Sequence, residues 1–162
     1  MRKKLITCTG IFIFIIFFSI LSYADNKPEI FSTWEGFEPD KCASIWLIKK
    51  FIKQNAEIKF FPKGSIINKG IPFDTPDAQF RRYHNMSTYE SLLKHYKIED
   101  PKLIYIGLLI HDVEINTWGR KAYPETEKMK EAVHMIMAQS QDTKIIINKS
   151  MDYFDTLYKS IN

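Results

Sequence analysis

Residues 100–112 read DPKLIYIGLLIHD, and the predicted fold is built around this stretch. Asp100 is placed to accept the first free N–H groups of a helix, and Pro101 suits the first helical turn. The residues from Leu103 to Ile110 are apolar on nearly every side. A helix that is apolar all round is a buried one. The sequence therefore predicts a helix from Pro101 to His111 at the centre of the fold.

Two helices are predicted on the N-terminal side of this stretch. The first opens at Pro39-Asp40, with Asp40 as its N-cap, and ends near Asn55. Its apolar stripe consists of Ala43, Trp46, Leu47 and Phe51. Ser87 and Glu90 have the spacing of a capping box, which predicts a second helix as far as about Tyr96.

Two further helices are predicted on the C-terminal side, one from Pro124 through Gln139 and one from a cap at Asp142 to about Ser160. Residues 56–61 are predicted to form a strand, residues 71–76 an extended segment and residues 78–83 a short strand. Residues 25–39 look polar and irregular. The predicted fold class is α+β and predominantly helical, with about five helices around a central apolar helix and a small β element.

The N-terminal 24 residues have the layout of a signal peptide. Arg2, Lys3 and Lys4 precede an apolar run, and Ser22 and Ala24 are the small residues of a cleavage site. We therefore expect an exported, periplasmic or extracytoplasmic protein with one domain over residues 25–162. An uncleaved membrane anchor is the alternative, because the apolar run is about as long as the shortest membrane spans.

Net charge and cysteine content narrow the classes of protein to which the chain can belong. The 162-residue chain has a formal net charge of +4, which falls to +1 without residues 1–24. A nearly neutral domain gives no argument for nucleic-acid binding, so no nucleic-acid partner is expected. Removal of Cys8 with the signal leaves Cys42 as a single thiol, which is expected to be buried.

Four polar residues are candidates for a metal site. No phosphate-binding glycine loop, CxxC pair or HExxH motif is present in the sequence. His84, Glu90, His111 and Asp112 supply the nitrogen and oxygen ligands that suit zinc or a similar divalent ion. If the helices at 87–96 and 101–111 run antiparallel through their short connection, these residues lie at one end of the domain. Capping and surface roles for the same residues are the alternative.

A second set of residues is predicted to bind an anion or to orient the metal ligands. Arg81 and Arg82 provide positive charge close to a helix N-terminus, where free N–H groups also attract anions. Asp40 is placed to hold an imidazole N–H. Asp74 belongs to the same set, although a turn between two prolines is its simplest role.

Several blocks of the sequence resemble the C-terminal domain of the chromate-resistance protein ChrB and its exported single-domain relatives. Residues 40–52, DKCASIWLIKKFI, resemble the family pattern D-R-x-A-x-x-W-L-I-R-R-F-I-D. Shorter matches follow in the family's order: Pro72-Phe73-Asp74, His84 with Thr88-Tyr89-Glu90, Ile110-His111-Asp112, and residues 153–158. The resemblance covers about residues 34–160.

The resemblance implies a chromate-resistance-type domain without the DNA-binding part of the larger regulator. We expect it to bind or sense a metal ion or an oxyanion, with the oligomeric state left open. A metal-dependent hydrolase or lyase at the same cluster is one alternative. A structural or partner-binding domain without bound metal is another. A membrane partner is expected only if residues 1–24 are retained.

Overall fold

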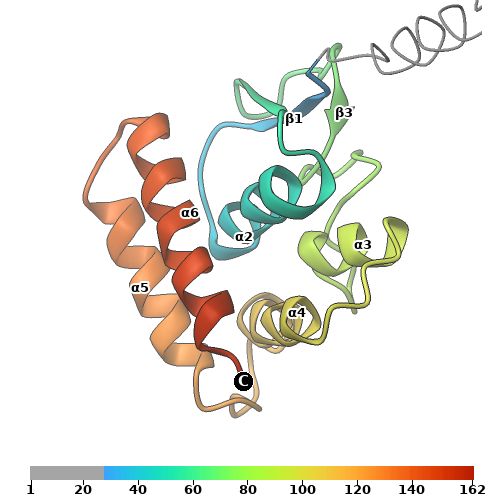
Figure 1. The fold of residues 1–162 in the computed structure, drawn as a ribbon. Coiled ribbons are helices and arrows are strands. Elements are labelled where there is room, and N and C mark those ends of the chain that lie inside the picture. Colours follow the sequence, from blue (N-terminus) through green and yellow to red (C-terminus); the bar gives the residue numbers. More distant parts are fainter. Residues whose placement is uncertain (1–27) are drawn as a thin grey trace, which may run out of the picture.

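The computed structural model describes residues 28–162, and the predicted signal peptide lies outside them. The described part contains five α-helices, one π-helical segment and three short parallel strands (Figure 1). In chain order they are β1 (Ile30–Trp34), α2 (Pro39–Leu47), the π-helix η1 (Ile48–Ile52), β2 (Glu57–Phe61), β3 (Ile71–Pro72), α3 (Thr88–His95), α4 (Pro101–Glu114), α5 (Thr126–Ala138) and α6 (Thr143–Ser160). The predicted helix-rich fold with a small β element is confirmed.

The sheet has the order β2-β1-β3, with β1 between two parallel neighbours. Strand β1 lies within residues 25–39, which were predicted to be irregular, so that prediction is wrong. Phe31, Ser32 and Thr33 are all buried, so β1 lacks the alternation of apolar and polar residues that marks a half-exposed strand. The strand expected at residues 78–83 is reduced to two isolated bridges, Phe73 with Phe80 and Tyr83 with Met86.

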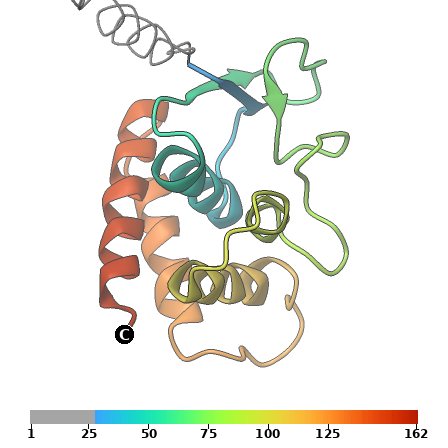
Figure 2. The same cartoon turned by 45° about the vertical axis from the view of Figure 1, so that its right-hand side comes forward.

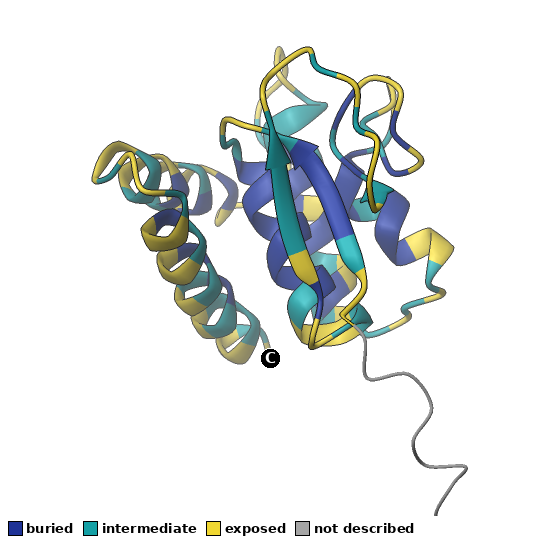
Figure 3. Cartoon of the chain, turned by 90° about the horizontal axis from the view of Figure 1, so that it is seen from above, coloured by how far each residue is buried: buried dark blue, intermediate teal, exposed yellow. Residues whose placement is uncertain are grey.

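Helix α2 occupies the centre of the fold, and all nine of its residues are buried. It packs against α3, α4, α5 and α6. Figures 1 and 2 show α5 and α6 on one side of it, α3 on the other, and the sheet at one end of the molecule. Coloured by burial, β1 and α2 form the continuous buried layer (Figure 3).

Helix α4 was expected to be central, but one side of it faces solvent. Ile104 and Leu108 on that side are 43% and 36% exposed. Leu103, Ile106, Leu109 and Ile110 on the other side are buried. An all-round apolar sequence therefore does not put α4 at the centre, because α2 is already covered on more sides by its neighbours.

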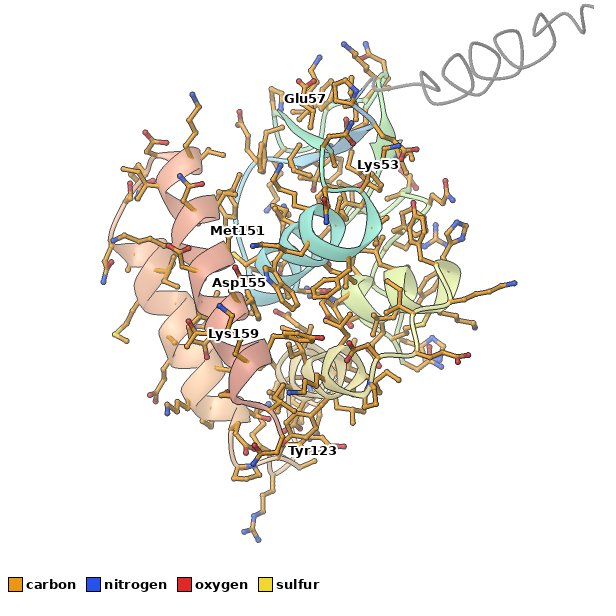
Figure 4. The ribbon with its side chains drawn as sticks, in the orientation of Figure 1. Lys53, Glu57, Tyr123, Met151, Asp155 and Lys159 are labelled. Carbon is orange, nitrogen blue, oxygen red and sulfur yellow. The ribbon has the colours of Figure 1, made fainter. Side chains whose placement is uncertain are left out.

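Trp46 joins α2 to the C-terminal helix. Its ring is fully buried and packs against Phe154 and Tyr158 of α6. The indole Nε1–H donates to Asp155 Oδ1 at 2.8 Å, and Lys50 pairs with the other oxygen of that carboxylate. Asp155 lies on the side of α6 that faces α2 (Figure 4). The predicted apolar stripe is confirmed at Trp46.

The capping predictions for α3, α4 and α6 are confirmed. Ser87 and Glu90 form the reciprocal capping box of α3. The carboxylates of Asp100 and Asp142 each accept the first free N–H groups of the helix that follows. Cys42 is buried, as expected, and burial raises the pKa of its thiol to about 11. Among residues 28–162, no helix is both long enough and apolar enough to span a bilayer.

Candidate functional site

The structure brings two of the four predicted metal ligands together. The first turn of α3 packs beside the last turn of α4, so Nδ1 of His111 lies 3.0 and 3.1 Å from the two oxygens of Glu90. Both side chains are partly exposed. Glu90 also accepts the backbone N–H and the hydroxyl of Ser87 in the capping box. The predicted antiparallel approach of these helix ends therefore occurs at this pair.

Asp112, the neighbour of His111, is bonded to a different part of the chain. Its carboxylate accepts hydrogen bonds from the Asn116 side chain, the backbone of Ala122 and the hydroxyl of Thr126. The pKa of Asp112 is lowered, because these hydrogen bonds favour the charged carboxylate and outweigh the opposing effect of burial. Asp112 thus closes the loop between α4 and α5.

His84 lies exposed in the loop before α3 and makes none of the hydrogen bonds or ion pairs found within residues 28–162. Over the same residues, no three His, Cys, Asp or Glu side chains are grouped so that they hold a metal ion. The four-residue metal site stays a prediction, with the Glu90–His111 pair as the part whose residues are in contact.

Asp40 is not the N-cap of its own helix, contrary to the sequence prediction. Helix α2 begins at Pro39 with Glu38 at the N-cap position and without a side-chain cap. The Asp40 side chain is fully buried and accepts the backbone N–H groups of Thr88 and Tyr89, at 2.8 and 2.9 Å. These are the first free N–H groups of α3. Asp40 therefore caps a helix that starts 48 residues away.

Arg82 connects three carboxylates near the start of α2. Its guanidinium lies 3.1 Å from Glu38, 3.0 Å from Glu114 and 3.7 Å from Asp40. Burial raises the pKa of Glu114 to about 7, although the charge of Arg82 opposes this. The sequence prediction included Asp40 and Arg82 but missed Glu38 and Glu114. Two features of the sequence could have indicated them: Glu38 directly precedes the proline that opens α2, and Glu114 lies in the last turn of the apolar helix α4.

Asp74 follows strand β3 and has a left-handed backbone, with φ of 52°. Its Oδ1 accepts the hydroxyl of Thr88 at 2.9 Å. Its Oδ2 is buried, accepts no hydrogen bond from the described residues, and lies 3.6 Å from Nζ of Lys41. That ammonium group instead donates to the carbonyls of Trp34 and Gly36, both at 2.8 Å. Burial, and then the charge of Asp40, raise the pKa of Asp74 to about 7.

Asp74 lies on a cleft at the carboxyl ends of β1 and β3, beside the start of α2. Two adjoining hollows of about 340 and 410 Å³ share Glu38, Asp74 and Pro76 as lining residues. The acidic lining residues are Glu35, Glu38 and Asp74. The basic lining residues are Lys41, Lys63, Arg81 and Arg82. We call this combined hollow the charged cleft.

The position of the charged cleft is the one that parallel sheets use to bind ligands. From the central strand β1, the chain continues to β2 on one side and returns to β3 on the other. In α/β folds, ligands bind outside the carboxyl ends of the strands where the strand order reverses in this way. Sequence reasoning missed the cleft because it missed β1, which supplies one wall.

The fold and the cleft define a small domain of mixed α and β structure with a charged cleft at the end of its parallel sheet. The family pattern described as "ChrB, C-terminal domain" matches residues 31–161. The chain therefore belongs to the ChrB C-terminal domain family, which implies a role related to chromate resistance. Comparisons with curated proteins and with solved structures give no significant match.

Proposed function

We propose that this protein is an exported binding or sensing domain that takes a small oxyanion into the charged cleft. The observation that carries the proposal is the pair Lys63 and Arg81, one on each half of the cleft. Neither makes an ion pair within residues 28–162, and Arg81 stacks on Tyr83 at 4.9 Å. Their charges are therefore available to a ligand, whereas Lys41 is held by two backbone carbonyls and Arg82 by neighbouring carboxylates.

The balance of charge in the cleft supports an oxyanion as the ligand. Four basic side chains and three acidic ones line it. A tetrahedral oxyanion such as chromate is small enough for either hollow and needs several donors around it. Family membership makes chromate the first oxyanion to test.

The test is calorimetric titration of the full chain with chromate. Wild-type protein is expected to bind, and the double variant Lys63→Ala/Arg81→Ala is expected to lose at least about tenfold in affinity, the loss of one charge-assisted contact. Lys128→Ala/Lys144→Ala removes the same charge from exposed positions on α5 and α6 and serves as the matched control. Absence of chromate binding by wild-type protein, or equal affinity in both double variants, contradicts the proposal.

A metal ion is the second candidate ligand, and the contact between His111 and Glu90 is the observation that favours it. An imidazole and a carboxylate at the protein surface can supply two ligands to zinc or a similar divalent ion. We expect zinc to bind wild-type protein and His111→Ala to abolish that binding, whereas His134→Ala, at an exposed position on α5, retains it. Equal zinc binding by both variants contradicts a site at His111.

A further inference from the structure

We propose that Asp74 binds the oxyanion as a protonated carboxyl group, so that each dianion enters the charged cleft together with one proton. The inference rests on the proposed function, and it assigns to Asp74 a direct contact with the ligand. Its basis is a carboxyl group that is buried, strained in its backbone and incompletely hydrogen bonded at the edge of a cleft.

The geometry gives Asp74 one free oxygen. The side chain is only 4% exposed, and Oδ1 is already bonded to Thr88. Oδ2 has no hydrogen-bond partner within the described residues, although Asp74 lines both halves of the cleft. Native proteins rarely leave a buried polar atom unbonded, so this oxygen calls for an explanation. The left-handed backbone of Asp74, which is uncommon for a residue other than glycine, holds it in this position.

The groups that face Asp74 make its charged form unfavourable. From α2 and its N-cap, Asp40 and Glu38 add negative charge, and Lys41 partly compensates. From α3, only the neutral hydroxyl of Thr88 makes contact. Burial is the largest cause of the raised pKa of about 7. The Asp74 carboxylate can therefore take up a proton near neutral pH at a small cost in free energy.

Protonation of Asp74 removes the repulsion between its buried carboxylate and a bound dianion. An ionised Asp74 repels an oxyanion oxygen, because neither has a hydrogen to share. With one proton taken up from solvent, Oδ2–H donates to the oxyanion and a repulsive contact becomes a hydrogen bond. Oδ2 exposes almost no surface, so the ligand reaches it after a small side-chain movement.

Sulfate is the best probe for the proton, because it does not itself take up a proton between pH 6 and pH 9. Uptake of one proton predicts that sulfate affinity of the full chain falls about tenfold per pH unit above the pKa of Asp74. Titrations at pH 8 in two buffers of different ionisation enthalpy count the proton directly in wild-type protein. We expect about one proton taken up per sulfate.

Asp74→Asn is the variant that isolates this group. The amide keeps the oxygen that accepts from Thr88 and donates an N–H to the ligand at every pH. Sulfate binding by Asp74→Asn is therefore expected to be nearly independent of pH and, at pH 8.5, about 30-fold tighter than in wild-type protein. His84→Gln is the control, because His84 is exposed and does not line the cleft. It should keep the wild-type pH dependence.

The outcomes separate the two proposals. If wild-type protein binds neither sulfate nor chromate at any pH, the proposed oxyanion function fails. If it binds sulfate without proton uptake, or if Asp74→Asn keeps the wild-type pH dependence, the role of Asp74 is refuted while oxyanion binding stands. The proton count needs no variant, so the inference is still tested if Asp74→Asn does not fold.

Discussion

Replacement of Asp40 by alanine tests how much one buried carboxylate contributes by capping a distant helix. The change leaves the N–H groups of Thr88 and Tyr89 without their acceptor at a buried helix start. Each buried donor left unbonded costs about 1–3 kcal/mol. Relief of the burial that raises the pKa of Asp40 offsets part of that loss. We therefore expect Asp40→Ala to lower the free energy of unfolding by about 2–5 kcal/mol.

Asp142 provides the matched comparison, because it caps α6 with the same pattern of two accepted N–H groups. It differs in being exposed and adjacent to its own helix. Water replaces a lost acceptor at such a position, so Asp142→Ala is expected to cost about 1 kcal/mol. Asp40→Asn keeps an oxygen acceptor of the same size and should fall between the two alanine variants.

Urea unfolding at pH 7, followed by tryptophan fluorescence and circular dichroism, measures all three variants. The transition midpoints should fall in the order Asp142→Ala, Asp40→Asn, Asp40→Ala, from highest to lowest. A loss in Asp40→Ala no larger than that in Asp142→Ala would refute the view that burial makes this cap expensive to remove. It would also show that α3 keeps its position without Asp40.

Three other predictions concern the core, the buried acids and export. Trp46→Ala should cost about 3–5 kcal/mol through lost burial and a cavity, whereas the same change at Trp118, which is 99% exposed, should leave the melting temperature nearly unchanged. The pKa values of Asp74 and Glu114 are raised to about 7 in the folded protein, so the native state binds more protons than the unfolded state. Their contribution to stability should therefore decrease as pH rises from about 4 to about 7, and thermal unfolding of Asp74→Asn/Glu114→Gln should show a weaker pH dependence over that window; an unaltered dependence contradicts it. Intact-mass measurement of exported protein should give a chain that begins at Asp25, and a mass that includes residues 1–24 would exclude cleavage.

Whether a contact of a candidate site residue could be predicted depends on how far away its partner lies in the sequence. Ser87 and Glu90 cap a helix within four positions, and Glu90 and His111 meet because two adjacent helices are joined by a short connection. Such contacts follow from helix geometry and loop length. The bonding of Asp112 differs from the prediction because the loop after α4 folds back and supplies N–H and O–H donors that no periodic pattern announces.

The sequence by itself determined the five helices, most of their caps, the burial of Trp46 and Cys42, and membership of the ChrB C-terminal domain family. These features depend on hydrogen bonds between near neighbours and on apolar periodicity, which are both readable along the chain. Only the tertiary structure decided which helix is central, that β1 is the middle strand, and that Asp40 caps α3. It also placed Asp74 at the charged cleft. Pairing of parallel strands and burial of a carboxylate depend on groups tens of residues away, and no local pattern specifies which of those groups will be neighbours.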